Sequence, residues 1–324
     1  MTVPTLNLPI LHLLEKSERI LIAGAGGGFD VFAGLPIYYT LRAMGKTVHL
    51  ANYSFTEFGL AKVLSDTEPV LDTLAMGVRG KVRHNIQYYP EGFLSQWFLE
   101  KQGEDVPVWL LARSGAQALT AAYKALIAHL GGIDALLLVD GGVDSIMRGD
   151  EDGAGTLLED TLSLIAAEAL EVPVKLLACI GFGTEAEENV CHYHALENMA
   201  ALARRSGFYG ACALTREMPA FQFYQDACMY VWEQPNHHKS HISTRIIPAV
   251  NGVFGQFDLY DSSRAFALIS MLMSLYWFFD ASIVVQNNLL VDDLRGTYAF
   301  EDAFRICAQR RLSSPLRKRR ALPY

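Results

Sequence analysis

The sequence has little charge, no surplus of basic residues and no long hydrophobic run. Charged residues make up 19% of its 324 positions and hydrophobic residues 51%, which excludes a disordered chain. The formal net charge of −8 argues against a nucleic-acid partner, because such a protein is expected to carry a basic face. The most apolar stretch, residues 265–279, is too short to span a bilayer, so no membrane partner is expected.

Cysteines are few, and they form no motif. The five are widely and irregularly spaced, and without a CxxC pair neither a zinc ribbon nor a redox dithiol is expected. The N-terminus lacks the basic start and the cleavage site of a signal peptide, so we expect a cytoplasmic protein. The one basic run, residues 317–320, lies near the C-terminus, and we interpret it as a solvated, frayed tail.

The sequence is rich in strand-like apolar runs that alternate with helical patterns. This alternation predicts a Rossmann-like, three-layer α/β/α fold with a mainly parallel sheet. The expected strands are residues 19–23, 47–51, 106–111, 135–139, 174–180 and 210–214. No sharp boundary divides the chain, so we expect a single α/β domain over residues 1–324. Within it, residues 216–324 form a helix-rich C-terminal part, with helices expected at 219–233, 262–279 and 299–311.

A glycine loop follows the first expected strand. Its glycines are Gly24, Gly26, Gly27 and Gly28. Glycine lets the backbone turn tightly and approach an anion, and the N–H groups of the next helix favour negative charge. We therefore expect these glycines to bind the phosphate of a ligand, the alternative being a tight turn without one. Asp30 follows directly and either caps the helix or binds a hydroxyl or amine of the ligand.

The glycine loop departs from the dinucleotide-binding fingerprint. Phe29 stands at the third glycine position, and Asn52 stands where an acidic residue would bind a ribose hydroxyl. Both departures weaken the prediction of an NAD-dependent oxidoreductase. No lysine follows the glycines, which excludes a P-loop.

An acidic loop follows the most strand-like run of the sequence, residues 135–139. It contains four carboxylates and one arginine: Asp140, Asp144, Arg148, Asp150 and Glu151. Carboxylates at the end of a strand hold a divalent cation such as Mg²⁺, act as acid or base, or bind ribose hydroxyls. We take Asp140 and Asp144 as candidate metal ligands and, with Arg148, as candidate catalytic residues, since arginine pairs well with phosphate. The alternative is a solvated acidic loop with an internal Arg–Asp pair.

Four more residues are expected at the same edge of the sheet. Gly141 and Gly142 belong to the acidic loop, and Gly183 and Glu185 follow the strand at 174–180, where the alternative is a plain loop with a helix cap. Because the carboxyl ends of parallel strands meet at one edge, we expect these residues, the glycine loop and Asp140 to form one ligand site.

Two other polar groups have more than one interpretation. His237, His238 and His241 would ligate a metal, contact the substrate or form a plain polar loop. Glu159 and Asp160 begin a helix, and we interpret them as residues that the helix dipole favours.

Several of these segments together resemble the domain of unknown function 1152 family. The resemblance lies in residues 26–31, 140–151, 159–160, 181–185, 243–247 and 273–279. Its specific part is Asp-Gly-Gly-Val-Asp at 140–144, and it extends over nearly the whole chain. It implies a single Rossmann-like unit and supports the choice of motifs, but it implies no catalytic role, because the family brings no established activity.

These observations predict an enzyme that binds a nucleotide or another phosphorylated small molecule at the carboxyl edge of its sheet, with transferase or hydrolase chemistry. The expected cofactor is a nucleotide with a divalent cation such as Mg²⁺. The alternatives are a non-catalytic metabolite-binding or scaffold protein and an NAD-dependent oxidoreductase.

A homo-oligomer is expected from the segment at 262–279. As a helix it would be apolar nearly all round, so it would have to be buried on several faces. Burial against a second copy in a homodimer is one solution, and a helix wholly internal to one subunit is the other.

Overall fold

The centre of the molecule is a nine-stranded sheet with the order β3-β4-β5-β2-β1-β6-β7-β11-β8. The computed structural model describes residues 4–84, 86, 88–153, 155–185, 189–235, 237–256 and 268–322. Neighbouring parallel strands form the middle of the sheet: β5 (Val108–Ala112), β2 (Thr47–Ser54), β1 (Arg19–Gly24), β6 (Ala135–Gly141) and β7 (Val174–Ile180). The prediction of a Rossmann-like α/β fold with a mainly parallel sheet is confirmed.

Antiparallel strands complete both edges of the sheet. On one side these are β4 (Ala75–Arg79) and β3 (Asp66–Leu71), which form a hairpin next to β5. On the other side they are β11 (Leu275–Asp280) and β8 (Phe208–Ala213), which follow β7. The sequence analysis predicted neither the hairpin nor β11.

The central strands are apolar throughout because both faces of the sheet are covered. In β1, Ile20 and Ile22 belong to the hydrophobic cluster on one face, and Leu21 and Ala23 to the cluster on the other. All four side chains are fully buried. Side chains alternate between the two faces of a strand, so a strand buried on both faces needs a continuous apolar run.

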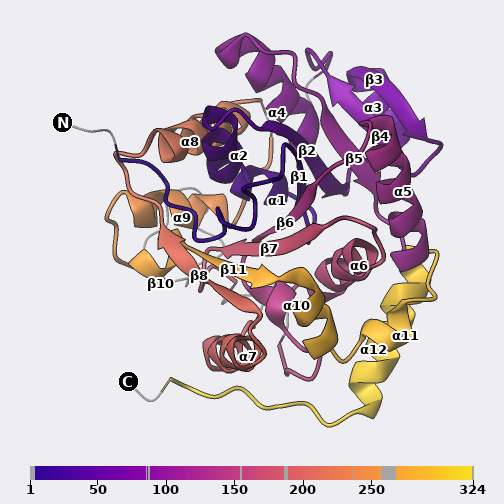
Figure 1. Ribbon diagram of the computed structural model, residues 1–324, viewed down its shortest axis with the longest axis vertical. Coiled ribbons are helices and arrows are strands. Elements are labelled where there is room, and N and C mark those ends of the chain that lie inside the picture. The colour runs from indigo at the N-terminus through magenta and orange to yellow at the C-terminus, as the bar shows by residue number, and fades with distance from the viewer. Residues whose placement is uncertain are drawn as a thin grey trace.

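Helices form a layer on each face of the sheet (Figure 1). One layer contains α1 (Asp30–Ala33), α2 (Leu35–Ala43), α3 (Phe58–Leu64), α4 (Pro90–Trp97), α8 (Pro219–Trp232) and α9 (Ser243–Val250). The other contains α5 (Ala116–His129), α6 (Leu157–Glu168), α7 (His192–Arg204), α10 (Ala281–Asn287), α11 (Val291–Leu294) and α12 (Phe300–Ser313). In the described part of the chain, no helix is both long and apolar enough to cross a membrane.

Short elements connect these layers. They are the π-helical turn η1 (Phe98–Gln102), the 3-10 turns η2 (Asp144–Ile146) and η4 (Met271–Ser274), and the antiparallel pair β9 (Gly255–Gln256) and β10 (Leu268–Ile269). The C-terminal part is rich in helices as predicted, but it also contributes β11 to the central sheet.

The prediction of a helix at residues 262–279 is wrong for residues 268–279, the part of this segment that the structure describes. Residues 257–267 lie outside the described residues, and β11 occupies the apolar end. Tyr276 and Phe278 pack into the cluster on one face of the sheet, and Phe279 into the cluster on the other. A strand with two buried faces and a helix that is apolar all round have the same composition, so periodicity did not separate them. The prediction of a homodimer depended on this helix, so the segment no longer supports it.

Candidate functional site

The connection of the parallel strands reverses between β1 and β6. From β1, the chain fills one side of the sheet with β2 and β5 and the other side with β6 and β7. In an open α/β sheet, such a reversal leaves a crevice outside the carboxyl ends of the two strands. A cavity of about 260 Å³ lies there, lined by the loops after β1, β6 and β7 and by residues 238–243.

The cavity brings together most of the residues expected at the site. Those that line it are Gly26, Gly27, Gly28, Asp30, Asp140, Gly141 and Glu185. Gly24 packs behind the loop, where a Cβ would lie 2.1 Å from Asn52 Oδ1. Gly183 is not in the lining; its nearest neighbours are His192 and Met273.

Five carboxylic acids that are nearly excluded from solvent gather here: three of them line the cavity, and Asp144 and Asp160, which are not among the lining residues, lie next to those three. They are Asp30, Asp140, Asp144, Asp160 and Glu185, with exposed fractions of 9%, 2%, 1%, 0% and 5%. They form two groups, Asp30 with Asp140 and Asp160, and Asp140 with Asp144 and Glu185. Within each group, one oxygen of every residue lies within 4.8 Å of the others. Oxygens bound to one cation at about 2.0–2.6 Å are separated by at most roughly 5 Å, so each group has the spacing of a cation site.

Burial changes the protonation of these acids. Desolvation raises the pKa of Asp30 to about 7. It also raises the pKa of Asp140, Asp160 and Glu185 well above their ordinary values, and repulsion from the neighbouring carboxylates adds to the shift. A nearby positive ion has the opposite effect, because it favours the charged form of each acid. The cluster is therefore suited to a cation that allows its members to ionise together.

Two buried oxygens of the cluster have no hydrogen-bond partner among the described residues: Asp144 Oδ1 and Asp160 Oδ1. Thr156 contacts the second oxygen, Oδ2, of each of these two side chains. Its N–H and its hydroxyl donate to Asp144 Oδ2 at 2.5 and 2.9 Å, and its hydroxyl lies 3.4 Å from Asp160 Oδ2. Buried polar atoms are normally satisfied, so an unpaired pair of oxygens at one site points to a bound ion.

The glycines around the cluster make room for the carboxylates. A Cβ at Gly142 would lie 2.2 Å from Glu185 Cδ, and one at Gly155 would lie 2.4 Å from Asp144 Oδ2. A Cβ at Gly26 would lie 2.9 Å from Asp160 Oδ1. Real side chains essentially never approach so closely, and the acids thus require glycine at these positions.

N–H groups of both the glycine loop and the acidic loop point at Asp30. Gly26 donates to its Oδ2 at 2.7 Å and Gly141 to its Oδ1 at 3.1 Å, and a hydrogen bond from Gly27 helps to lower its pKa. The anion that Gly26 holds is therefore a side chain of the protein itself. A ligand phosphate at this cavity needs another source of positive charge.

Glu91, a buried acid that was not singled out from the sequence, supports the glycine loop through Asn52. Glu91 is fully buried and accepts hydrogen bonds from Asn52 Nδ2 at 2.8 Å and from Thr56 Oγ1 at 3.0 Å. Asn52 Nδ2 also lies 3.0 Å from the carbonyl oxygen of Gly28, to which it donates. Asn52 stands at the position where a dinucleotide-binding protein has a ribose-binding acid. Its side-chain amide is instead engaged in hydrogen bonds within the protein.

Asp160 was misinterpreted from the sequence. It is fully buried and belongs to the carboxylate cluster, so it is not simply a residue that the helix dipole favours. Its neighbour Glu159 points elsewhere and pairs with Arg113 at 2.9 Å.

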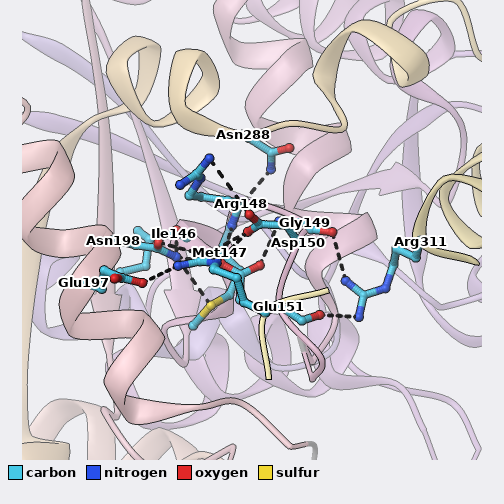
Figure 2. Close-up of polar contacts among 11 residues, drawn as sticks. Ile146, Met147, Arg148, Gly149, Asp150, Glu151, Glu197, Asn198, Asn288 and Arg311 are labelled. Atoms are coloured by element: carbon cyan, nitrogen blue, oxygen red, sulfur yellow. Dashed lines mark hydrogen bonds and ion pairs between the residues drawn. The ribbon is translucent and has the colours of Figure 1, made fainter. Parts of the chain in front are cut away.

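Arg148 lies in a loop that Glu151 holds in place by hydrogen bonds (Figure 2). Glu151 is fully buried and accepts hydrogen bonds from the N–H groups of Arg148 and Gly149 at 3.0 and 2.8 Å, and from Asn198 Nδ2 at 2.9 Å. The guanidinium of Arg148 lies 4.0 Å from the carboxylate of Asp150. Arg148 is not among the described residues that line the cavity, so its position does not support the expected contact with a substrate.

The C-terminal tail is docked onto this loop. Arg317 forms ion pairs with Asp150 at 2.8 Å, with Glu151 at 2.6 Å and with Glu197. Arg311 donates to the carbonyl oxygens of Gly149 and Glu151, as Figure 2 shows. The prediction of a frayed, solvated tail at residues 317–320 is therefore wrong for Arg317. Its side chain is only 25% exposed.

The three histidines have separate roles. His237 is 7% exposed; its Nε2 accepts a hydrogen bond from the N–H of Tyr89 at 3.1 Å, and its Nδ1 donates to the carbonyl oxygen of His238 at 2.8 Å. With both ring nitrogens engaged, His237 is not placed to bind a metal. His238 and His241 line the cavity, together with Lys239.

The family described as "Protein of unknown function (DUF1152)" matches residues 92–318, more than half of the chain. The chain belongs to this family. The matched range contains Asp140, Asp144, Asp160 and Glu185 and begins after the glycine loop. No curated protein and no solved structure matches the chain.

Proposed function

We propose that this member of the DUF1152 family is a divalent-cation-dependent enzyme that acts on a nucleotide or another small phosphorylated molecule. The observation that carries the proposal is the cluster of buried carboxylates at the reversal point of the sheet. Carboxylate oxygens are the ligands that Mg²⁺ and Mn²⁺ prefer. Asp140, Asp144 and Glu185 are the proposed ligands of the cation.

The cavity favours a phosphorylated ligand only when it holds a cation. Ionised carboxylates repel a phosphate, whereas Mg²⁺ is usually bound by one or two carboxylates together with substrate phosphates. Lys239, His238 and His241 line the same cavity and add donors for phosphate oxygens. The ligand phosphate is thus proposed to lie between the carboxylate cluster and this segment.

Hydrolase or transferase chemistry suits this arrangement better than hydride transfer. A bound cation stabilises the charge that develops on a phosphoryl group or its leaving group. The cavity volume of about 260 Å³ lies just below the range typical of drug-sized ligands, roughly 300–1,000 Å³, which favours a ligand no larger than a mononucleotide. Asn52 is engaged with Glu91, which also disfavours the ribose contact of an NAD site.

Turnover by the stripped and reloaded protein tests the proposal. The full chain is treated with EDTA, and release or transfer of phosphate is measured for a panel of nucleotides and sugar phosphates with and without Mg²⁺ or Mn²⁺. We expect turnover only with the cation, and a loss of about 10²-fold or more in Asp140→Asn and Asp144→Asn. Cation-dependent binding without turnover supports the metabolite-binding alternative, and no effect of either cation on binding or turnover contradicts the proposal.

A further inference from the structure

We infer that the carboxylate cluster holds two divalent cations, with Asp140 shared between them. This inference rests on the proposed function, which places the first cation at Asp140, Asp144 and Glu185. The second cation lies at Asp30, Asp140 and Asp160.

The two sites share Asp140 and otherwise use different parts of the chain. Asp30 begins α1 and Asp160 lies in the first turn of α6, whereas Asp144 and Glu185 come from the loops after β6 and β7. Ser145 fixes the shared carboxylate, because its N–H and its hydroxyl donate to Asp140 Oδ2 at 3.2 and 2.5 Å. In two-cation sites the ions lie about 3.5–4 Å apart.

Each proposed site contains one buried oxygen without a hydrogen-bond partner. Asp144 Oδ1 belongs to the first site and Asp160 Oδ1 to the second, and their side chains are 1% and 0% exposed. Gly26 lines the cavity, and a Cβ there would lie 2.9 Å from Asp160 Oδ1, so the glycine leaves space beside that oxygen. One cation in the first site would satisfy Asp144 and leave Asp160 unsatisfied, so the second unpaired oxygen is evidence for the second ion.

Charge balance leads to the same number of ions. When ionised, the five carboxylates carry a formal charge of −5, and one divalent cation reduces this charge to −3. Two cations reduce it to −1. An uncompensated charge in a buried site is costly, so the doubly loaded cluster is the more stable ionised form.

The number of bound ions and their mutual distance test this inference. Mn²⁺ alone is titrated into the EDTA-treated full chain by calorimetry, and the electron paramagnetic resonance spectrum of the loaded protein is recorded. We expect two ions per chain and the spectrum of an exchange-coupled Mn²⁺ pair. One ion per chain overturns the second site and leaves the proposed function standing, whereas no bound ion overturns both. Two ions without coupling overturn the sharing of Asp140.

Three variants assign the ions to their sites. Asp160→Asn removes a ligand of the second site only, and Glu185→Gln removes a ligand of the first site only, so each variant is expected to bind one ion without coupling. Glu159→Gln is the matched control, because Glu159 is a largely buried acid that pairs with Arg113 and belongs to neither group, and it is expected to bind two coupled ions. Circular dichroism establishes that each variant is folded. Two coupled ions in folded Asp160→Asn would overturn the assignment.

Discussion

The carboxylate of Asp30 accepts a hydrogen bond from the N–H of Gly141, 3.1 Å away and 111 residues later in the chain. The same carboxylate accepts the N–H of Gly26, so one side chain joins the loops that follow β1 and β6. These two strands meet where the chain order of the sheet reverses, and Asp30 thus joins the two walls of the cavity. It joins these loops as an element of the fold, and in the proposed two-cation site it is also a ligand of the second cation.

Replacing Gly142 by alanine tests the role of glycine in placing the acids. The added Cβ would lie 2.2 Å from Glu185 Cδ, so Glu185 must move. We expect Gly142→Ala to lower the free energy of unfolding by about 1–3 kcal/mol, as overpacking does, and to weaken Mn²⁺ binding. Gly59→Ala is the control: Gly59 lies in α3 with open space around it, and alanine there is expected to add up to about 1 kcal/mol. Urea denaturation measures both variants, and equal stability of the two would refute this role.

Stabilisation by a cation is expected to increase with pH. Burial raises the pKa of Asp30 from 3.8 to about 7, so between these values the folded state binds more protons than the unfolded state. The contribution of Asp30 to stability is therefore complete below about pH 4 and is lost as the pH rises through about 7. Because a cation binds the ionised acids, Mn²⁺ should raise the Tm of the EDTA-treated protein more at about pH 8 than at about pH 5.5. An equal shift of the Tm at both pH values is the contrary result.

The docked tail is expected to contribute to the stability of the fold. Arg317 lies 2.6 Å from the fully buried carboxylate of Glu151, which keeps its three other hydrogen bonds when Arg317 is removed. We expect Arg317→Ala to lower the free energy of unfolding by about 1–3 kcal/mol, less than the loss of a completely buried pair. Lys318→Ala, an exposed neighbour in the same basic run, should change it by less than about 0.5 kcal/mol. If urea denaturation gives the same value for both variants, the tail is not held by Arg317.

His237 is expected to destabilise the fold in acid. Burial lowers its pKa from 6.5 to about 4, so the unfolded state binds more protons between these values, and stability falls as the pH falls through this window. The full effect amounts to at most about 3 kcal/mol. In His237→Gln the amide oxygen is able to accept the N–H of Tyr89, and this variant should lose less stability between about pH 6.5 and 4.5. His12→Gln, at an exposed position, is the control. The prediction fails if both variants follow the wild-type profile.

The sequence predicted the parallel core of the fold because that core depends on local patterns. Apolar runs such as residues 135–139 and 174–180 need no partner to be recognised as buried strands, and parallel strands align their carboxyl ends. For the same reason, the glycine loop and Asp140 were expected at one site, and both line the cavity. β11 was not predicted, because its antiparallel place between β7 and β8 depends on contacts that are distant in sequence.

The chemistry of the site was less predictable because it depends on burial. Asp160 and Glu91 look like ordinary acids near the start of a helix, and only the packing around them excludes water. Arg148 and Arg317 are engaged within the protein, although the sequence predicts otherwise. From the sequence, Arg148 is expected to contact a substrate, and Arg317, in the basic tail, is expected to face solvent. Both arginines pair with Asp150: Arg148 lies two positions away from it in the sequence, and Arg317 lies 167 positions away.

Anomalous X-ray diffraction from crystals of the full chain soaked in Mn²⁺ tests the central claim most directly. The account predicts anomalous density at the carboxyl ends of β1 and β6, about 2.0–2.6 Å from oxygens of Asp140, with one peak toward Glu185 and one toward Asp160. Density at surface sites alone, with none within reach of Asp140, would contradict it.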